Sequence, residues 1–265
     1  IVVCVKQVPN PELAASQYRV DEQARTVSPV AGVQWVMSPF DEQAVEAALR
    51  IRDAHPATKI TVMSLGPESA RNVIKHALAM GADEGVLLAD TAFAGSDGYT
   101  TALTLAAAIR KMGNVDVVLT GRQAADWDGG VVGAGIGELL GVPVISFAKE
   151  VYIEDGMARV ERVLDDGTET VEAPLPAVVT VSNELGAPRA PSLRETMRAA
   201  RKPVATWSAS DLGLAAETVG AAGARRVLER MFIPVKQNRC EFIAGNSPEE
   251  QAAGLVQRLR EAKLI

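Results

Sequence analysis

The sequence predicts an α/β protein whose core is a mostly parallel, twisted sheet with helices on both faces. Strand-like and helix-like segments alternate along the first half of the chain, which is typical of β-α-β units. Continuous apolar runs such as residues 1–5 (IVVCV) favour strands that are buried on both faces. The 265 residues are enough for one large domain, or for a domain with a smaller appendage.

The helices of this first half have recognisable start and stop signals. Ser38 is expected at the N-cap of a helix, with Pro39 in its first position and Asp41 three residues after the serine. Gly81 and Gly141 are expected just after the ends of two later helices. The expected strands are residues 1–5, 59–65, 85–89 and 116–120, and the expected helices are the one after Ser38, residues 68–80, residues 99–112 and the segment before Gly141.

After Pro143 the pattern changes to an alternation of apolar and polar residues, which indicates half-exposed antiparallel strands. Asp155-Gly156 and Asp166-Gly167 are the strongest hairpin signals in the chain. We therefore expect a region of antiparallel hairpins that completes the same domain on its far side. Its expected strands are residues 145–153, 158–164, 169–173 and 177–181.

From Asn183 onward the regular pattern is lost, apart from a short helix that starts at Ser192 and an amphipathic helix over residues 248–263. The apolar stripe of the last helix follows irregular chain, so it needs a surface elsewhere to cover it. The sequence thus predicts an extended C-terminal arm that ends in a helix. The expected parts are a nucleotide-binding α/β domain with its hairpin extension (1–182), a partner-docking loop with a short helix (183–207) and the arm (208–265).

Composition excludes several classes of function. A net charge of −6 and 4% aromatic residues give no support for nucleic-acid binding. The longest apolar run is too short to cross a bilayer, so direct membrane insertion is not expected. Cys4 and Cys240 lie far apart without CxxC spacing, which argues against a metal site or a disulfide framework and suits a reducing compartment.

Residues 115–141 form the segment most typical of a ligand site. A buried strand leads into a glycine- and aspartate-rich loop over residues 121–130, and an apolar helix follows. Backbone N–H groups of such a loop, together with the helix N-terminus, bind phosphate. An ordinary tight βα connection remains the alternative, because glycine also suits a sharp turn. Gly133, Gly135 and Gly137 lie inside the helix and are expected to serve helix packing.

Ligands of parallel α/β sheets bind at the carboxyl ends of the strands. Four segments should therefore meet in one crevice: the end of the first strand near Cys4, the cap at residues 38–41, the turn after Leu65 and the loop at residues 121–132. Within that loop, Trp127 either covers a nucleotide or packs against a partner, and both readings stay open.

Several long motifs resemble the β subunit of electron transfer flavoproteins, and the resemblance covers nearly the whole chain. The motifs are VCVKQVP (3–9), MSPFDEQAVEAALRIRD (37–53), HALAMGAD (76–83), DVVLTGRQAADWD (116–128) and VERVLDDGTETVEAPLPAVVT (160–180). This family is an αβ heterodimer that takes electrons from acyl-CoA and related flavin dehydrogenases, as in fatty acid β-oxidation. It passes them to a membrane quinone oxidoreductase or another acceptor.

The resemblance implies two nucleotide cofactors. The redox FAD is held mainly by the α subunit, with the β subunit covering one side, and Phe40 is the expected contact. The β subunit also buries an adenine nucleotide, AMP in the familiar branch. By resemblance its binding residues are Cys4, Ser38, Pro39, Phe40, Asp41, Leu65, Gly121, Arg122, Gln123, Ala124, Ala125, Asp126, Trp127, Asp128, Gly129, Gly130, Val131 and Val132.

The resemblance also implies two partner surfaces and a location. Leu193 matches the residue that anchors the family to its donor dehydrogenase, and Arg189 and Met197 are expected beside it. The C-terminal helix matches the arm that wraps the α subunit. No residue is expected to act as an acid, base or nucleophile, because the flavin does the redox chemistry. The expected location is the cytoplasm of a bacterium or archaeon, or the mitochondrial matrix.

The loop departs from both known branches of the family. Residues 121–123 and 132–133 favour the electron-bifurcating branch, in which the β subunit binds a second FAD that accepts hydride from NADH. However, Gly129 and Val131 replace Thr and Gln, and Trp127 replaces a glycine. These changes remove side-chain hydrogen bonds that the second flavin would use, so the sequence favours AMP.

Overall fold

The computed structural model describes residues 1–234 and 240–265. The chain divides into two compact units, which are described separately. The first contains Ile1–Arg19 and Val27–Glu229, and the second contains Val20–Thr26 and Arg230–Ile265. Within the described residues, no helix is both long and apolar enough to cross a membrane.

The first unit is built on a nine-stranded sheet with the order β11-β10-β9-β12-β8-β1-β6-β7-β13. All neighbours from β9 to β13 in this order are parallel, and only the pairs β9–β10 and β10–β11 are antiparallel. The α/β prediction with a mostly parallel sheet is therefore confirmed. The strands are β1 (Val2–Cys4), β6 (Thr61–Leu65), β7 (Glu84–Leu88), β8 (Val117–Gly121), β9 (Val144–Glu154), β10 (Met157–Leu164), β11 (Gly167–Pro174), β12 (Ala177–Val181) and β13 (Val204–Trp207).

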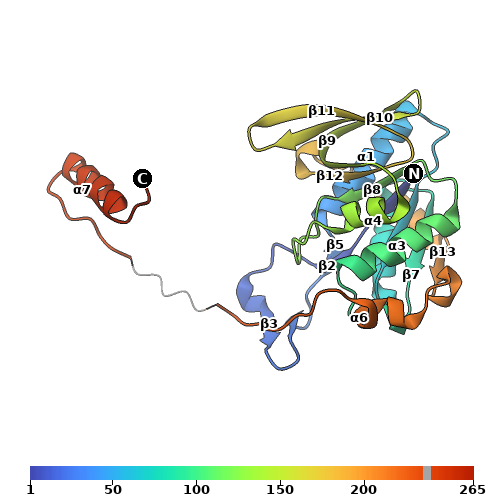
Figure 1. The fold of residues 1–265 in the computed structure, drawn as a ribbon, viewed down its shortest axis with the longest axis horizontal. Helices are drawn as coiled ribbons and strands as arrows, with labels where there is room; N and C mark the ends of the chain where they lie inside the picture. Colours follow the sequence, from blue (N-terminus) through green and yellow to red (C-terminus); the bar gives the residue numbers. More distant parts are fainter. Residues whose placement is uncertain (235–239) are drawn as a thin grey trace. The chain divides into compact units, whose positions relative to one another are not determined.

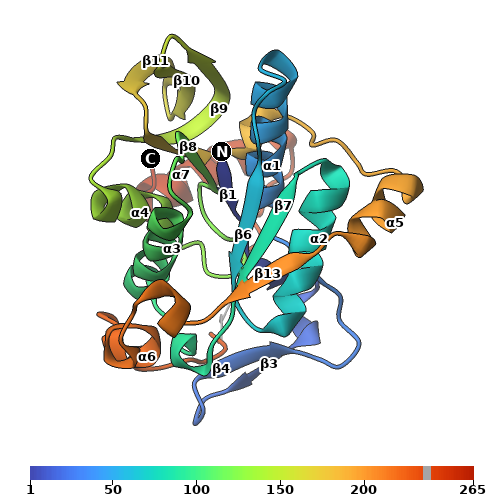
Figure 2. The same ribbon diagram turned by 90° about the vertical axis from the view of Figure 1, so that its right-hand side faces the viewer.

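Helices cover both faces of the sheet (Figure 2), with α1 (Pro39–Ala54) and α2 (Arg71–Met80) on one face and α3 (Gly98–Met112) and α4 (Val132–Leu140) on the other. Successive residues of a strand point to opposite faces. Accordingly, Val3 packs in the core with α1 and α2, whereas Val2 and Cys4 pack in the core with α3 and α4. Both faces of β1 are buried, as its apolar sequence predicts.

Shorter elements complete the first unit. The β9–β10–β11 hairpins extend one end of the sheet (Figure 1), and α5 (Leu193–Arg201) packs against α2. The remaining elements are β2 (Gln7–Pro9), β3 (Tyr18–Asp21), β4 (Thr26–Pro29), β5 (Trp35–Met37), α6 (Gly220–Gly223) and the 3-10 turns Ala15–Gln17, Glu68–Ala70, Thr91–Phe93, Asn183–Leu185, Ser210–Leu212 and Ala216–Thr218. The tip of the β3–β4 hairpin belongs to the second unit.

Two strands differ from the sequence prediction. β12 was expected among the antiparallel strands, but it lies between β8 and β9 and is parallel to both. Its sequence AVVTV is buried at every position, which is typical of an inner parallel strand rather than of a hairpin strand. β13 was not expected at all, because VATW is short and follows a basic helix, yet it pairs in parallel with β7 at the sheet edge.

The glycines inside α4 serve packing, as the sequence predicts. A Cβ atom at Gly133 would lie 2.5 Å from the Thr180 side chain, and one at Gly135 would lie 2.8 Å from Ala102 on α3. A side chain at Gly137 would overlap Val144. The absence of side chains therefore lets α4 approach both α3 and the sheet.

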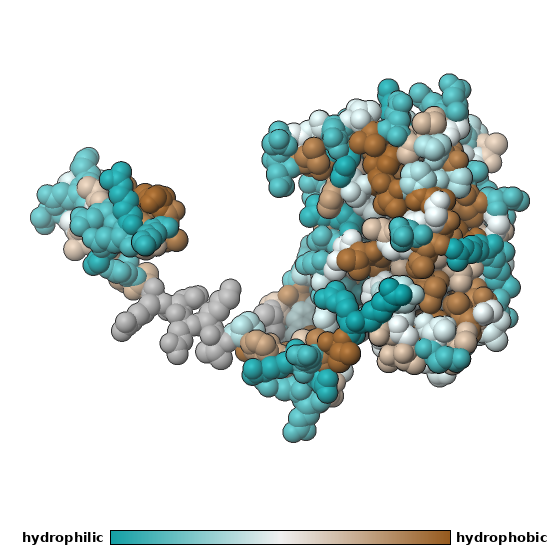
Figure 3. Space-filling model, in the orientation of Figure 1, coloured by the Kyte–Doolittle hydropathy of each residue, from teal (hydrophilic) through white to brown (hydrophobic). Residues whose placement is uncertain are grey.

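The second unit contains the expected amphipathic helix, α7 (Pro248–Glu261). Ser247 is its N-cap, and the serine hydroxyl accepts a hydrogen bond from the Glu250 amide at 3.3 Å. Leu255 and Val256 of its apolar stripe are exposed, and Figure 3 shows apolar atoms gathered along one side of this helix.

Candidate functional site

The topology predicts a ligand crevice at the carboxyl ends of β1 and β8. From β1 the chain passes through α1 to β6 and through α2 to β7, and α3 then returns it to β8 on the other side of β1. The direction of the connections reverses between β1 and β8, and ligands of doubly wound sheets bind at such a point. The expected crevice segments at residues 38–41 and 121–132 both lie here.

Asp41 joins the strands that flank this crevice. Its carboxylate is buried in the first turn of α1, where Oδ2 accepts the Lys6 amide at 2.8 Å and Oδ1 accepts the Gly121 amide at 3.1 Å. Burial raises the pKa of Asp41 to about 7, although the two backbone hydrogen bonds act to lower it. One side chain therefore fixes the ends of β1 and β8 to the N-terminus of α1.

The cap of α1 differs from the sequence prediction. Ser38 occupies the N-cap position, but its hydroxyl caps no helical amide. Instead it accepts the Ala125 amide of the loop at 3.3 Å, while the carboxylate of Asp41 accepts amides at the strand ends. The side chains of Ser38 and Asp41, which the sequence pattern assigned to helix capping, thus bind the loop and the strand ends of the crevice.

The loop between β8 and α4 is tied down at its start and open at its end. Lys6 Nζ forms an ion pair with Asp126 at 2.7 Å, and Gln123 donates to Asp128 at 2.9 Å. Among the described residues, the amides of Gly129 and Gly130 have no hydrogen-bond acceptor, and no side chain caps α4. These free N–H groups at a helix N-terminus are suited to a phosphate group.

Gly121 is required by close packing at the base of the loop. A Cβ atom at this position would lie 2.5 Å from Asp41 Oδ1 and 2.7 Å from the Phe40 Cβ. A Cβ atom at Gly129, in contrast, would have no neighbouring atom within 4 Å. The two loop glycines therefore differ in purpose, since the first permits contact with α1 and the second lies in open space.

A cation and two aromatic rings meet beside the loop. The Arg122 guanidinium lies 5.4 Å from the ring centroid of Phe40 and 5.6 Å from that of Phe147. Phe147 is exposed and has φ +61°, an unusual conformation for a bulky residue, at an irregular position of β9. Sequence reasoning missed Phe147, because it stands in an alternating segment that is typical of an ordinary strand.

The remaining crevice residues divide into buried and exposed ones. Cys4 is paired in register with Thr120 of β8, and burial, with a smaller effect of Asp41, raises the pKa of its thiol to about 12. It is therefore an apolar wall rather than a nucleophile. Leu65 and Val132 are half-buried. Trp127 is 61% exposed, and Val131 packs beside Gly98 of α3.

Comparisons with known proteins agree with this fold. A family model described as electron transfer flavoprotein domain matches residues 30–212. The chain is 39% identical over 265 residues to the caffeyl-CoA reductase-Etf complex subunit CarD of Acetobacterium woodii, covering 100% of this chain and 99% of the relative. The chain belongs to the electron transfer flavoprotein β-subunit family.

Two further relatives support this assignment. The electron transfer flavoprotein subunit beta of Megasphaera elsdenii is 34% identical over 273 residues, covering 100% of this chain and 99% of the relative. Protein FixA of Azorhizobium caulinodans is 37% identical over 242 residues, covering 88% and 84%. Membership of this family gives the chain a role in electron transport that involves a flavin.

The residues expected to contact a partner lie on and before α5. Leu193 and Met197 are four residues apart on the helix and are 77% and 57% exposed. Arg189 is not free, because its guanidinium forms ion pairs with Glu46 and Asp53 of α1, both at 2.8 Å. Leu193 and Met197 are therefore accessible to a partner, whereas Arg189 is already engaged by α1.

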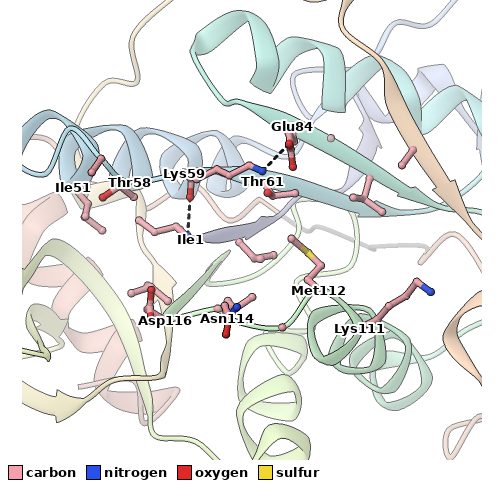
Figure 4. A pocket seen from close by; sticks show the side chains of 18 of the residues that line it. Ile1, Ile51, Thr58, Lys59, Thr61, Glu84, Lys111, Met112, Asn114 and Asp116 are labelled. Carbon is pink, nitrogen blue, oxygen red and sulfur yellow. Dashed lines mark hydrogen bonds and ion pairs between the residues drawn. The ribbon is translucent and has the colours of Figure 1, made fainter.

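A pocket of about 1070 Å³ lies at the opposite edge of the sheet, where β1, β6, β7 and β13 begin (Figure 4). None of the residues expected in the nucleotide site lines it. Its Lys59 and Glu84 side chains are paired with each other at 2.7 Å. In parallel α/β sheets the ligand binds at the other edge, so the crevice between β1 and β8 remains the candidate site.

Proposed function

We propose that this chain is the β subunit of a heterodimeric electron transfer flavoprotein. The complex carries electrons from a flavin dehydrogenase of the acyl-CoA type to a quinone oxidoreductase or another acceptor. Support comes from the relatives that are named as β subunits. The name of the A. woodii relative also includes a reductase of a CoA thioester, which supports a partner that acts on CoA thioesters, although the named direction is reduction.

The crevice between β1 and β8 is the proposed site of AMP. The observation that carries this proposal is the arrangement around Asp41, which holds the two strand ends together and leaves the amides of Gly129 and Gly130 unbonded. These amides and the N-terminus of α4 would bind the phosphate. Cys4 and Leu65 would supply apolar walls for the rest of the nucleotide.

The cluster of Arg122, Phe40 and Phe147 is the proposed surface that covers the FAD of the α subunit. Its two aromatic rings can shield a flat ligand from water, and Arg122 has no ion pair among the described residues. The flavin supplies the electron-transfer chemistry when bound. This chain's residues would orient the complex and exclude water from one side of the site.

Docking of the donor through α5 can be tested with Leu193→Ala. The flavin content of the αβ complex should be unchanged, and the apparent KM for the donor dehydrogenase should rise by roughly tenfold, as for a central interface residue. Leu164→Ala is the matched control, because Leu164 is an exposed leucine on the β10–β11 hairpin. An unchanged KM in the Leu193 variant would contradict the docking role.

The runner-up is an electron-bifurcating flavoprotein whose β subunit binds a second FAD. The sequence of residues 121–123 favours it, and Trp127, which replaces a glycine of that branch, is 61% exposed. The readout is anaerobic reduction of the purified αβ complex by NADH. Rapid bleaching of the flavin absorbance by NADH would favour this second function, and no reaction with NADH favours the carrier.

A further inference from the structure

Helix α5 is short and carries Leu193 and Met197 outward, yet it packs against α2. It lies beside α2 (Figure 2), and Ala199 is its one buried residue among those described. A nine-residue helix with so little burial is marginal in water. Other contacts must therefore keep it ordered, and they lie at its two ends.

The chain before α5 is tethered to α1 by Arg189. Its Nε and Nη2 atoms donate to Glu46 at 2.8 and 3.1 Å, and Nη2 also donates to Asp53 at 2.8 Å. The backbone amide of Arg189 donates to the same Glu46 at 3.1 Å. Arg50 adds a second cation, which bonds both to Glu46 at 3.1 Å and to the Leu185 carbonyl at 3.1 Å.

Glu46 is the centre of this tether. Only 5% of the residue is exposed, so its charge requires compensation. Burial acts to raise the pKa of Glu46, but the hydrogen bonds from Arg189 and Arg50 outweigh it and leave the pKa below its ordinary value. Charge-assisted, partly buried hydrogen bonds of this kind are the stronger ones in proteins.

The C-terminal end of α5 is tethered to α2 by Lys75. The ammonium donates to the carbonyls of Ala199 at 3.1 Å and Ala200 at 3.0 Å, and also to the carbonyl of Lys202. The last carbonyls of a helix lack partners within the helix, and a cation there also interacts favourably with the helix dipole. Lys75 therefore caps α5 from a neighbouring element.

We propose that Arg189 and Lys75 are positioning residues that clamp α5 at both ends, so that Leu193 and Met197 meet the donor dehydrogenase on an already ordered helix. This inference rests on the proposed docking function. A surface that is ordered before docking loses less conformational entropy on binding. Arg194, Arg198 and Arg201 are exposed without ion pairs among the described residues, so the partner surface is an apolar pocket with an acidic rim.

The test compares Arg189→Gln and Lys75→Met with Arg201→Gln in the complete αβ complex. Arg201→Gln removes one positive charge from the same helix without touching the clamp. Amide hydrogen exchange over residues 193–201 is measured without donor, and the kcat and apparent KM for the donor are measured separately. Both clamp variants should exchange roughly tenfold faster and raise the KM, with unchanged kcat and FAD content.

Two outcomes overturn the clamp. One is wild-type exchange over α5 in both clamp variants. The other applies where Leu193→Ala does raise the KM, and is a rise in KM in the clamp variants no larger than that of Arg201→Gln. Leu193→Ala separates this failure from failure of the proposed function. Faster exchange in the clamp variants, together with an unchanged KM in Leu193→Ala, would support the clamp and contradict the docking function.

Discussion

In the crevice between β1 and β8, side chains hold the backbone so that backbone amides remain free for a ligand. Asp41, Ser38 and Lys6 bond to the start of the loop, and Gly129 and Gly130 at its end stay unbonded. At α5 the arrangement is reversed, because Arg189 and Lys75 bond to the ends of the segment and leave apolar side chains free. This difference supports the proposed nucleotide site in the first region and the proposed protein-binding surface in the second.

The two regions should respond to pH in opposite directions, because each depends on a carboxylate of α1. Burial raises the pKa of Asp41 from its ordinary 3.8 to about 7, so the folded state binds this proton more tightly than the unfolded state. The stability that Asp41 contributes is therefore fully present below about pH 4 and falls as the pH rises through 7, by at most about 4 kcal/mol. Asp41→Asn cannot titrate, so the free energy of unfolding of wild type minus that of the variant should decrease over this range.

Glu46 provides the opposite case. Burial acts to raise its pKa, but Arg189 and Arg50 lower it below the ordinary 4.5, so its contribution is present above that pH and is lost as the pH falls through the lowered pKa. Chemical denaturation of wild type, Asp41→Asn and Glu46→Gln across the pH range measures both effects. The predicted opposition would be contradicted if the free energy of unfolding of wild type minus that of Asp41→Asn increased with rising pH, because that is the behaviour of a carboxylate whose pKa is lowered.

Gly121 lies in the part of the loop that packs against α1, whereas Gly129 lies in the part that is open to solvent. Gly121→Ala would press a methyl group against Asp41 and Phe40, so it should cost about 1–3 kcal/mol of stability and reduce the nucleotide content of the complex. Gly129→Ala meets no neighbour, so its stability should stay within about 0.5 kcal/mol of wild type. Equal effects of the two substitutions, measured by denaturation and nucleotide extraction, would show that the base of the loop is not specially packed.

The smallest change in stability is expected on removing the ion pair between Lys6 and Asp126. Lys6→Met should change the free energy of unfolding by no more than about 1 kcal/mol, because the pair is partly exposed. It should nevertheless accelerate amide exchange in the loop at residues 121–131. Lys59→Met is the matched control, since it removes an ion pair of the same 2.7 Å length at the opposite edge of the sheet. Loop exchange that is unaltered by Lys6→Met, or equally altered by the control, would show that Lys6 does not hold the loop.

Local patterns were sufficient for most of the fold but not for the pairing of every strand. Continuous apolar runs that alternate with helix-like segments predicted the parallel core, and α1 begins at Pro39 as its sequence indicates. The position of β12 was missed because strand partners depend on long-range packing, although its mostly apolar, non-alternating sequence AVVTV was a usable signal. β13 has only four residues and carried no such signal.

The candidate site could be located from the sequence, but its internal contacts could not. The convergence of strand ends followed from the general rule for parallel sheets. That Asp41 bonds to Lys6 and Gly121 could not be inferred, because the three residues are far apart in the chain. Arg189 likewise stands in a run of basic residues that is typical of a solvated surface, while its partner Glu46 is 143 residues away.

The nucleotide content of the purified αβ complex tests the central claim most directly. Nucleotides are released by denaturation, separated by chromatography and counted per αβ pair. Because the crevice between β1 and β8 is assigned to AMP and the flavin to the α subunit, the count should give one FAD and one AMP. Two FAD without AMP, or one FAD with no second nucleotide, would contradict this assignment.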